Sequence, residues 1–232
     1  MKRGVALLLT LYSAVAWAQR SQTPRIDMPL QDRLKLPQGV SSVSLRLTDF
    51  VGFIATSYKV PMLVEFAYSQ PDVLIAGGSY TAGQLLDQAV SQLRGYRWAP
   101  ENGVAHLYQS QLVKSKGNLL NVKLKKFYLP GNVTEFIEIL RSCVANSARG
   151  YGCAAASPST GCVACGLEKE PLPYRERFDE VSARAVLLRA LQTNGRFFVF
   201  IRFDTIHPKS NRDTQHAKWF VKSLVPDNAA PM

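Results

Sequence analysis

The sequence has few acidic residues, only three histidines, and no long apolar run after its first 18 residues. Its 232 residues include 28 Lys and Arg against 17 Asp and Glu, for a formal net charge of +11. Nothing beyond the N-terminal segment approaches the roughly 18 consecutive apolar residues of a transmembrane helix. We therefore expect no transmembrane segment in the mature chain, while the 47% hydrophobic content is typical of a folded protein.

The residues that usually build an active site are also missing or scattered. The histidines lack acidic neighbours at the spacing of metal ligands, and His106, on an expected strand, is interpreted as an ordinary half-exposed residue. Ser182 lacks the flanking glycines of a nucleophile, and Gly77-Gly78 lacks the rest of a phosphate-binding loop. The acidic residues Glu65, Asp72, Asp87 and Glu101 are too dispersed for a paired-carboxylate site. The sequence thus predicts a non-catalytic protein without a metal or a cofactor.

Cysteine is confined to one 23-residue stretch that contains Cys143, Cys153, Cys162 and Cys165. In an oxidising compartment this clustering predicts disulfides, and four cysteines permit three pairings. Cys162 and Cys165 also have the spacing of a thiol redox motif, but they follow a segment rich in glycine and alanine instead of a strand. We interpret the four as structural disulfides; a redox pair and a four-thiolate zinc site are the alternatives.

The first 18 residues have the three regions of a cleavable secretory signal. Two basic residues precede the mostly apolar run Val5–Val15, which is followed by the small-residue site Ala16-Trp17-Ala18. This pattern predicts that residues 1–18 are removed and that the mature chain, beginning at Gln19, is periplasmic or secreted; an uncleaved anchor is the alternative. Two of the eleven net positive charges leave with the signal, so the mature chain carries +9. Export argues against a nucleic-acid partner, whereas the positive charge would attract anionic polymers of the cell envelope.

Residues 42–110 predict one module with the order strand, helix, strand, strand, helix and hairpin. Thr81 and Gln84 have the form of a capping box, so a helix should begin at Ala82, and Gly95 should end it. The expected strands are Ser42–Thr48, Met62–Ala67 and Val73–Ala76, with a helix capped by Asp49 after the first of them. A turn at Pro100–Gly103 should close the hairpin.

Residues 118–205 predict a second, degenerate copy of this module. Val186, Leu187, Ala190 and Leu191 repeat Leu85, Leu86, Ala89 and Val90 at a constant offset. The other expected elements are a strand at Leu120–Leu129, a helix starting at Asn132, a helix capped by Ser182 and ended by Gly195, and a strand at Phe197–Asp204. The segment 145–173, which holds three of the cysteines, is interpreted as a loop inserted in this copy. A chance likeness between two unrelated pieces is the alternative.

The organisation expected is therefore a signal peptide (1–18), a linker (19–41), two modules, and a tail (206–232). Within the tail, Trp219–Leu224 should form a last strand or a short helix. The fold class is α+β, with two small modules in which two helices pack on a short mixed sheet, in a βαββαβ-like order.

The first module resembles the short N-terminal domain shared by secretins and TonB-dependent receptors. The resemblance lies in the element order over residues 42–108, the helix start at Gly78–Ala89, and the Gly-Tyr-Arg-Trp sequence at Gly95–Trp98. It implies a periplasmic, non-catalytic protein-protein interaction module whose partner is a secretin, a receptor or a regulator of the cell envelope. The chain lacks the long series of alternating strands of a secretin pore or receptor barrel, so such a module would act in trans or as a free-standing relative.

We expect binding at exposed sheet edges and at aromatic strand residues, because strand addition needs only an unpaired edge. The candidate surface residues are Tyr96, Trp98, Phe198 and Phe200. Two other functions fit the sequence: a disulfide oxidoreductase that uses Cys162 and Cys165, and a binder of anionic envelope polymers.

Overall fold

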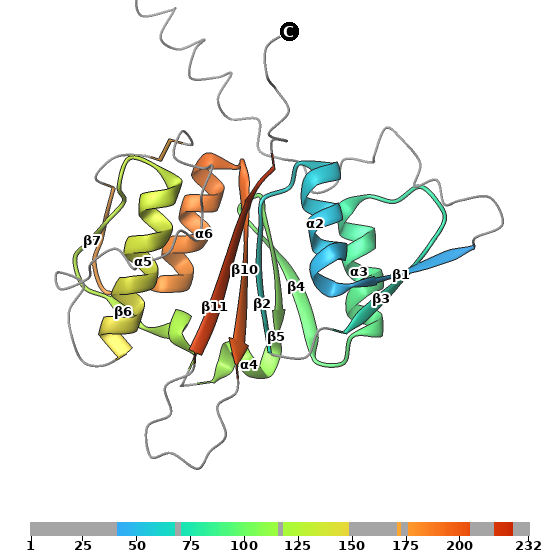
Figure 1. Cartoon of the computed structure of the whole chain (residues 1–232), viewed down its shortest axis with the longest axis horizontal. Coiled ribbons are helices and arrows are strands. Elements are labelled where there is room, and N and C mark those ends of the chain that lie inside the picture. Colours follow the sequence, from blue (N-terminus) through green and yellow to red (C-terminus); the bar gives the residue numbers. More distant parts are fainter. Residues whose placement is uncertain are drawn as a thin grey trace, which may run out of the picture.

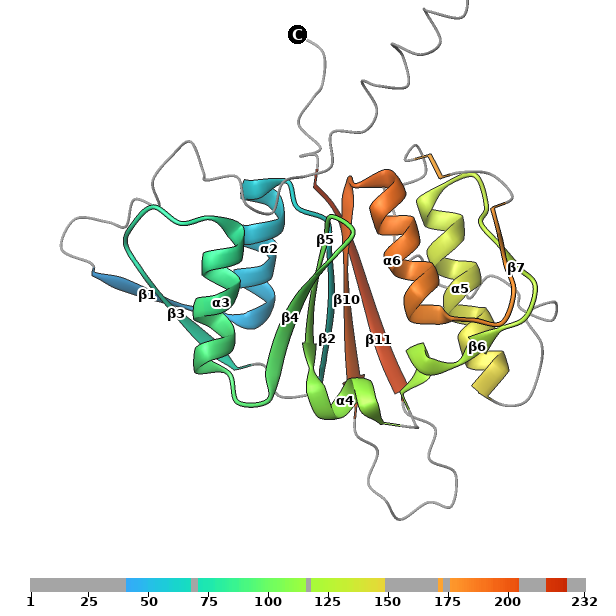
Figure 2. The same ribbon diagram turned by 180° about the vertical axis from the view of Figure 1, so that it is seen from behind.

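A five-stranded mixed sheet, in the order β11-β10-β2-β5-β4, lies at the centre of the molecule (Figure 1). The structure, a computed structural model, describes residues 41–67, 71–115, 118–148, 171–172, 176–204 and 216–224. Two helices cover each face of the sheet, and short two-stranded pairings lie outside each helix pair (Figure 2). The result is five layers, and the α+β class predicted from the sequence is confirmed.

The first half has the element order that the sequence predicts. Its elements are β1 (Ser42–Arg46), α2 (Leu47–Tyr58), β2 (Met62–Ala67), β3 (Asp72–Ala76), α3 (Ala82–Gln92), β4 (Tyr96–Glu101) and β5 (Val104–Gln109). The capping box is confirmed, because the Thr81 hydroxyl accepts from the Gln84 N–H and the Gln84 side chain accepts from the Thr81 N–H. Asp49 is not the cap of α2 but lies in its first turn.

The hairpin turn is tighter than predicted. It consists of Asn102 and Gly103 alone, both with positive φ, which is the geometry of a two-residue turn that matches the twist of the strands. Pro100 consequently lies within β4 instead of in the turn. A proline is tolerated there because β4 is an edge strand.

The second half follows the first with related elements. They are α4 (Ser110–Lys114), η1 (Leu119–Asn121), β6 (Lys123–Leu124), β7 (Phe127–Tyr128), α5 (Val133–Ala148), β8 (Arg177–Phe178), β9 (Val181–Ser182), α6 (Ala183–Asn194), β10 (Phe197–Asp204) and β11 (His216–Ser223). The single strand expected at Leu120–Leu129 is divided, since Lys126 takes a positive φ between β6 and β7. β11 forms within the expected tail, and it is a strand of the central sheet.

The two halves repeat the same local structures. Thr81 and Ser182 each cap a helix by accepting from the third helical N–H. The apolar positions that match in sequence are buried in both helices, except Val90, which is partly buried. β1 pairs with β3 in antiparallel register, and β6–β7 pair with β9–β8 in the same way. Each half also ends in a hairpin, β4–β5 or β10–β11.

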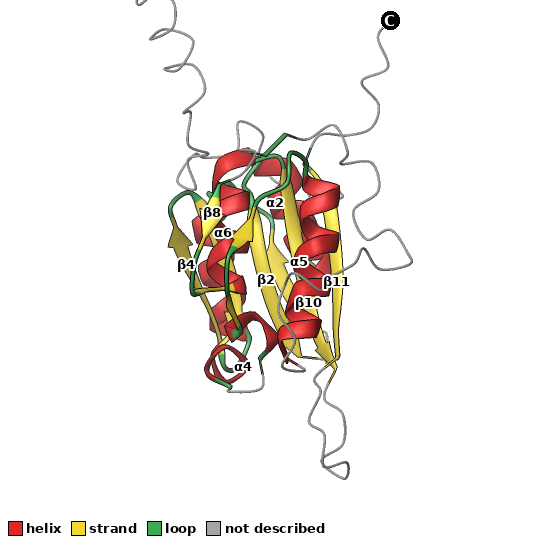
Figure 3. Cartoon of the chain, turned by 90° about the vertical axis from the view of Figure 1, so that its left-hand side faces the viewer, coloured by secondary structure: helices red, strands yellow, loops and turns green. Residues whose placement is uncertain are grey.

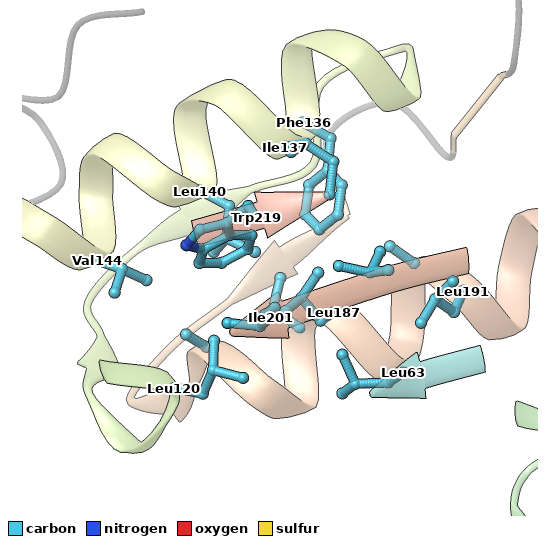
Figure 4. Packing of buried hydrophobic residues seen from close by; sticks show 14 of the residues in the cluster. Leu63, Leu120, Phe136, Ile137, Leu140, Val144, Leu187, Leu191, Ile201 and Trp219 are labelled. Carbon is cyan, nitrogen blue, oxygen red and sulfur yellow. The ribbon is translucent and has the colours of Figure 1, made fainter. Parts of the chain in front are cut away.

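The halves nevertheless share one sheet, so the expectation of a separate short sheet in each module is wrong. β10 pairs in parallel with β2, with Val199 opposite Leu63 and Phe203 opposite Ala67. The physical reason is that β2 is apolar on both faces: Leu63 belongs to the core under α5 and α6, and Val64 to the core under α2 and α3. Figure 4 shows the first of these cores, in which the Trp219 ring lies beside α5.

The outer edge of one small sheet, the β1–β3 pairing, is closed by a side chain. Gln92, at the end of α3, accepts from the Leu74 N–H at 2.9 Å and donates to the Leu74 carbonyl at 2.9 Å, so its amide occupies the outer edge of β3. In the central sheet, β4 and β11 lie at opposite margins (Figure 3).

Within the described part of the chain, no helix combines the length and the apolar character that crossing a membrane requires. The expected signal peptide and nearly all of the linker lie outside the described residues, as does most of segment 145–173. These assignments remain predictions.

The shared sheet predicts that the halves unfold together. Apart from Trp17 in the expected signal, the chain has one tryptophan in each half, Trp98 and Trp219. Trp98→Phe and Trp219→Phe therefore leave one fluorescent reporter in each half. In each variant, we expect the urea transition followed by tryptophan fluorescence to coincide with the transition followed by circular dichroism, with the same midpoint and the same slope. The two variants can differ from each other in midpoint, because the substitutions change stability by different amounts. A fluorescence transition separate from the circular dichroism transition would show independent modules.

A buried charge cluster between the two halves

One carboxylate lies at the centre of the molecule. Glu65 is on β2, the middle strand, and its side chain is completely buried among apolar residues. Burying a single charge in this way is strongly unfavourable unless other groups pair with it and donate to it. The groups that do so identify the most unusual polar site in the described residues.

Three side chains donate hydrogen bonds to Glu65. Arg184 contacts both carboxylate oxygens, Nε donating to Oε1 at 2.5 Å and Nη2 to Oε2 at 2.9 Å. His106 lies 2.9 Å from Oε1 through Nε2, and Asn118 donates to Oε2 at 3.1 Å. A two-point contact with a guanidinium fixes both the direction and the distance of the carboxylate.

The cluster reaches the surface through a second carboxylate. His106 Nδ1 lies 2.7 Å from Oε1 of Glu101, whose side chain is partly exposed at the end of β4. With a carboxylate beside each ring nitrogen, His106 satisfies both contacts only as the doubly protonated cation. The four charges of Glu101, His106, Glu65 and Arg184 then cancel.

Opposing effects set the pKa values of this cluster. Burial raises the pKa of Glu65, but hydrogen bonds from Arg184 and His106, together with their positive charges, outweigh it and lower the pKa to about 2. Burial lowers the pKa of His106, but hydrogen bonds to Glu101 and Glu65 and the charges of these carboxylates raise it above its ordinary value. Both shifts favour the charged forms.

This arrangement is suited to holding the two halves together. Glu65 and His106 come from strands of the first half, whereas Arg184 is the second residue of α6 in the second half. Arg184 Nη1 also donates to Oδ1 of Asn121 at 2.5 Å, so it connects η1 to the cluster. A histidine with protons on both nitrogens has no lone pair with which to accept a proton, so in this state it is not a general base.

The sequence pattern did not predict this site. His106 is 2% exposed, so its interpretation as half-exposed is wrong. Glu65 contacts His106 and Arg184, which lie 41 and 119 positions away in the sequence. One signal was present, because Glu65 is a charged residue inside the apolar run Met62–Ala67. Its partners could not be identified, since β2, β5 and α6 meet only through tertiary packing.

The aromatic residues expected to form a binding surface lie elsewhere than predicted. Tyr96, Phe198 and Phe200 are buried in the core under α2 and α3, so they are not an exposed surface. The reason is that helices cover both faces of the central sheet. Trp98 is partly buried, and its indole Nε1 donates to Asp87 of α3 at 2.7 Å.

Of the four cysteines, only Cys143 lies in the described residues. It is buried on α5 and is disulfide-bonded, not a free thiol. Cys153, Cys162 and Cys165 lie outside the described residues, so the pairing stays a prediction. Within the described residues, no group of three or more His, Cys, Asp or Glu side chains is placed to hold a metal ion.

Removing the guanidinium from the cluster should be strongly destabilising. Arg184→Met leaves the buried Glu65 without its two-point partner, and we expect a loss of about 3–5 kcal/mol in the free energy of unfolding. The matched control is Arg189→Met on the same helix, which removes a partly exposed ion pair with Glu176 and should cost about 0–1 kcal/mol. Urea denaturation measures both, and equal losses would contradict a stabilising role for the cluster.

The raised pKa of His106 predicts a pH dependence of stability. Its contribution is complete below the ordinary pKa of 6.5 and disappears as the pH rises through the higher pKa of the folded state. The difference in unfolding free energy between wild type and His106→Gln should therefore shrink as the pH rises above about 6.5, the ordinary pKa of histidine. Over this range Glu65 stays ionised, because its pKa is lowered. A difference that is constant or grows with pH would contradict the assignment of a histidine cation.

No protein-family model, no curated protein and no solved structure matches this chain.

Proposed function

We propose that this chain is an exported, non-catalytic protein-protein interaction module of the cell envelope. The observation that carries the proposal is the repetition of one arrangement in the two halves. In each half, two helices lie between an outer antiparallel strand pairing and a hairpin that belongs to the shared sheet. The element order of the first half is the order on which the resemblance to secretin and TonB-receptor short domains rests. The signal-like residues 1–18 support the periplasm as the compartment.

Exposed apolar side chains support a binding role. Leu74, Tyr128 and Phe220 are exposed by 51%, 48% and 44%, and they lie on β3, β7 and β11, which belong to three different sheets. A large apolar side chain in water gains free energy when a partner covers it. Single exposed residues are common on monomers, so these three define positions to test and not a continuous patch.

The test uses the mature chain, from Gln19, as bait in a detergent extract of the cell envelope. We expect it to recover a secretin, a receptor or a regulator component. The matched control carries Leu74→Glu, Tyr128→Glu and Phe220→Glu together, which leaves the cores intact and should lose the partner. Equal recovery by bait and control would contradict binding at these positions. Recovery of no envelope protein, together with reproducible turnover of a substrate, would contradict the function.

A further inference from the structure

The two margins of the central sheet differ in their capacity to accept another strand. β4 closes one margin, and Pro100 within it has no backbone N–H to donate. β11 closes the other margin with eight residues and no proline. Within the described residues it pairs with β10 alone. A strand with a row of unpaired backbone donors and acceptors is a template for an added strand.

The first half of the chain indicates what should lie beside β11. β5 is the second strand of the first hairpin; it lies between β4 and β2, and β2 runs parallel to it. β11 is the second strand of the corresponding hairpin, but the described residues of the second half contain no counterpart of β2 beside it. Among the described residues, the repeat therefore leaves a position beside β11 for one strand, oriented parallel to β11.

The side chains of β11 indicate the chemistry of that strand. Trp219 is buried in the core under α5 and α6, whereas Lys218, Phe220 and Lys222 are exposed on the opposite face. Side chains that share a face on adjacent strands contact each other, and opposite charges or two apolar groups stabilise the pair. An added strand that fits this face has an apolar residue beside Phe220 and an acidic residue beside Lys222, two positions further along.

A second copy of this chain is a poor occupant. Two β11 strands paired antiparallel about Phe220 would bring Lys218 of one copy opposite Lys222 of the other. Like charges in directly opposed positions are destabilising, and edge lysines are a common means of preventing self-association. The positive charge of the expected mature chain, +9, adds to the preference for an acidic partner.

We propose that the edge of β11 that no described strand covers binds an extended segment of a partner protein, parallel to β11, in which an apolar residue is followed two positions later by an acidic residue. This inference rests on the proposed function and specifies its surface and the chemistry of its partner. The backbone of β11 supplies the pairing, Phe220 supplies the apolar contact, and Lys222 supplies the selectivity for an acidic residue.

Site-specific photo-cross-linking of the full chain in the cell envelope tests this inference. A benzophenone amino acid replaces Phe220, Leu74 or Tyr128 in turn; all three side chains are exposed, so the core is not disturbed. We expect a cross-linked partner from position 220 and none from the other two. Mass spectrometry of the adduct should identify a peptide with Asp or Glu two residues C-terminal to the cross-linked position, beside Lys222.

Charge and orientation are tested with further variants. Lys222→Glu, combined with the cross-linker at position 220, should reduce the yield of adduct about tenfold, because repulsion replaces attraction at one pair. Lys125→Glu, at an exposed lysine on the outer pairing of β6–β7 with β8–β9, should leave the yield unchanged. Cross-linkers at positions 218 and 222 test the orientation. In a parallel complex, the cross-linker at position 218 reacts with a partner residue that precedes the one reached from position 220. The cross-linker at position 222 reacts with a partner residue that follows it.

Each other result overturns the inference in a different way. Adducts from position 74 or 128 but not 220 would reject the β11 edge and leave the proposed function standing. Adducts from none of the three positions would contradict both. A cross-link from position 220 to the same chain would show that another segment of this chain covers the edge. A cross-link to a second copy would show that the edge mediates self-association. Either result would reject a partner protein at this edge. If Lys222→Glu leaves the yield of adduct unchanged, the acidic character of the partner strand is rejected. If the partner residues reached from positions 218, 220 and 222 occur in the reverse order, the parallel orientation is rejected.

Discussion

Strand β2 is the element on which both halves of the molecule depend. It pairs in parallel with β5 from its own half and with β10 from the other, and its side chains point alternately into two different cores. An insertion of one residue in β2 would exchange the two sets of side chains and disturb both cores at once. This explains why the two halves form one shared sheet instead of two separate sheets.

The buried charges add specificity to this apolar pairing. Packing alone permits a helix to slide or rotate over a sheet with little change in the buried area, whereas the two contacts of Arg184 with Glu65 are satisfied in one position only. Ion pairs of this kind contribute little net stability when compared with apolar residues of the same shape, so we assign them to the choice of geometry. His106 extends the network to the surface, and its charge makes the junction of the halves responsive to pH.

Local structure was predictable from the sequence, and the long-range arrangement was not. The capping box of α3, the serine cap and the terminal glycine of α6, and the apolar repeats of the helices are determined by residues within four or five positions of each other, and they are present. Whether β10 joins β2 or forms its own sheet depends on pairing between residues more than 130 positions apart. The alternation of apolar and polar residues predicts that a segment is a strand, but it does not identify the strand with which that segment pairs. The same limit applies to the charge cluster. The aromatic run Phe197–Phe203 indicated a strand correctly, but it was interpreted as an exposed surface because the second helix layer was not foreseen.

The side chain of Gln92 has a further consequence. A primary amide carries the same donor and acceptor as a peptide group, so this single residue imitates one position of a neighbouring strand along β3. Any chain that approached β3 at Leu74 would first have to displace a group that is attached to α3 and is therefore always present at high local concentration. The outer pairing β1–β3 is thus protected by intramolecular competition, and the fold limits the sites at which it can be extended by another chain.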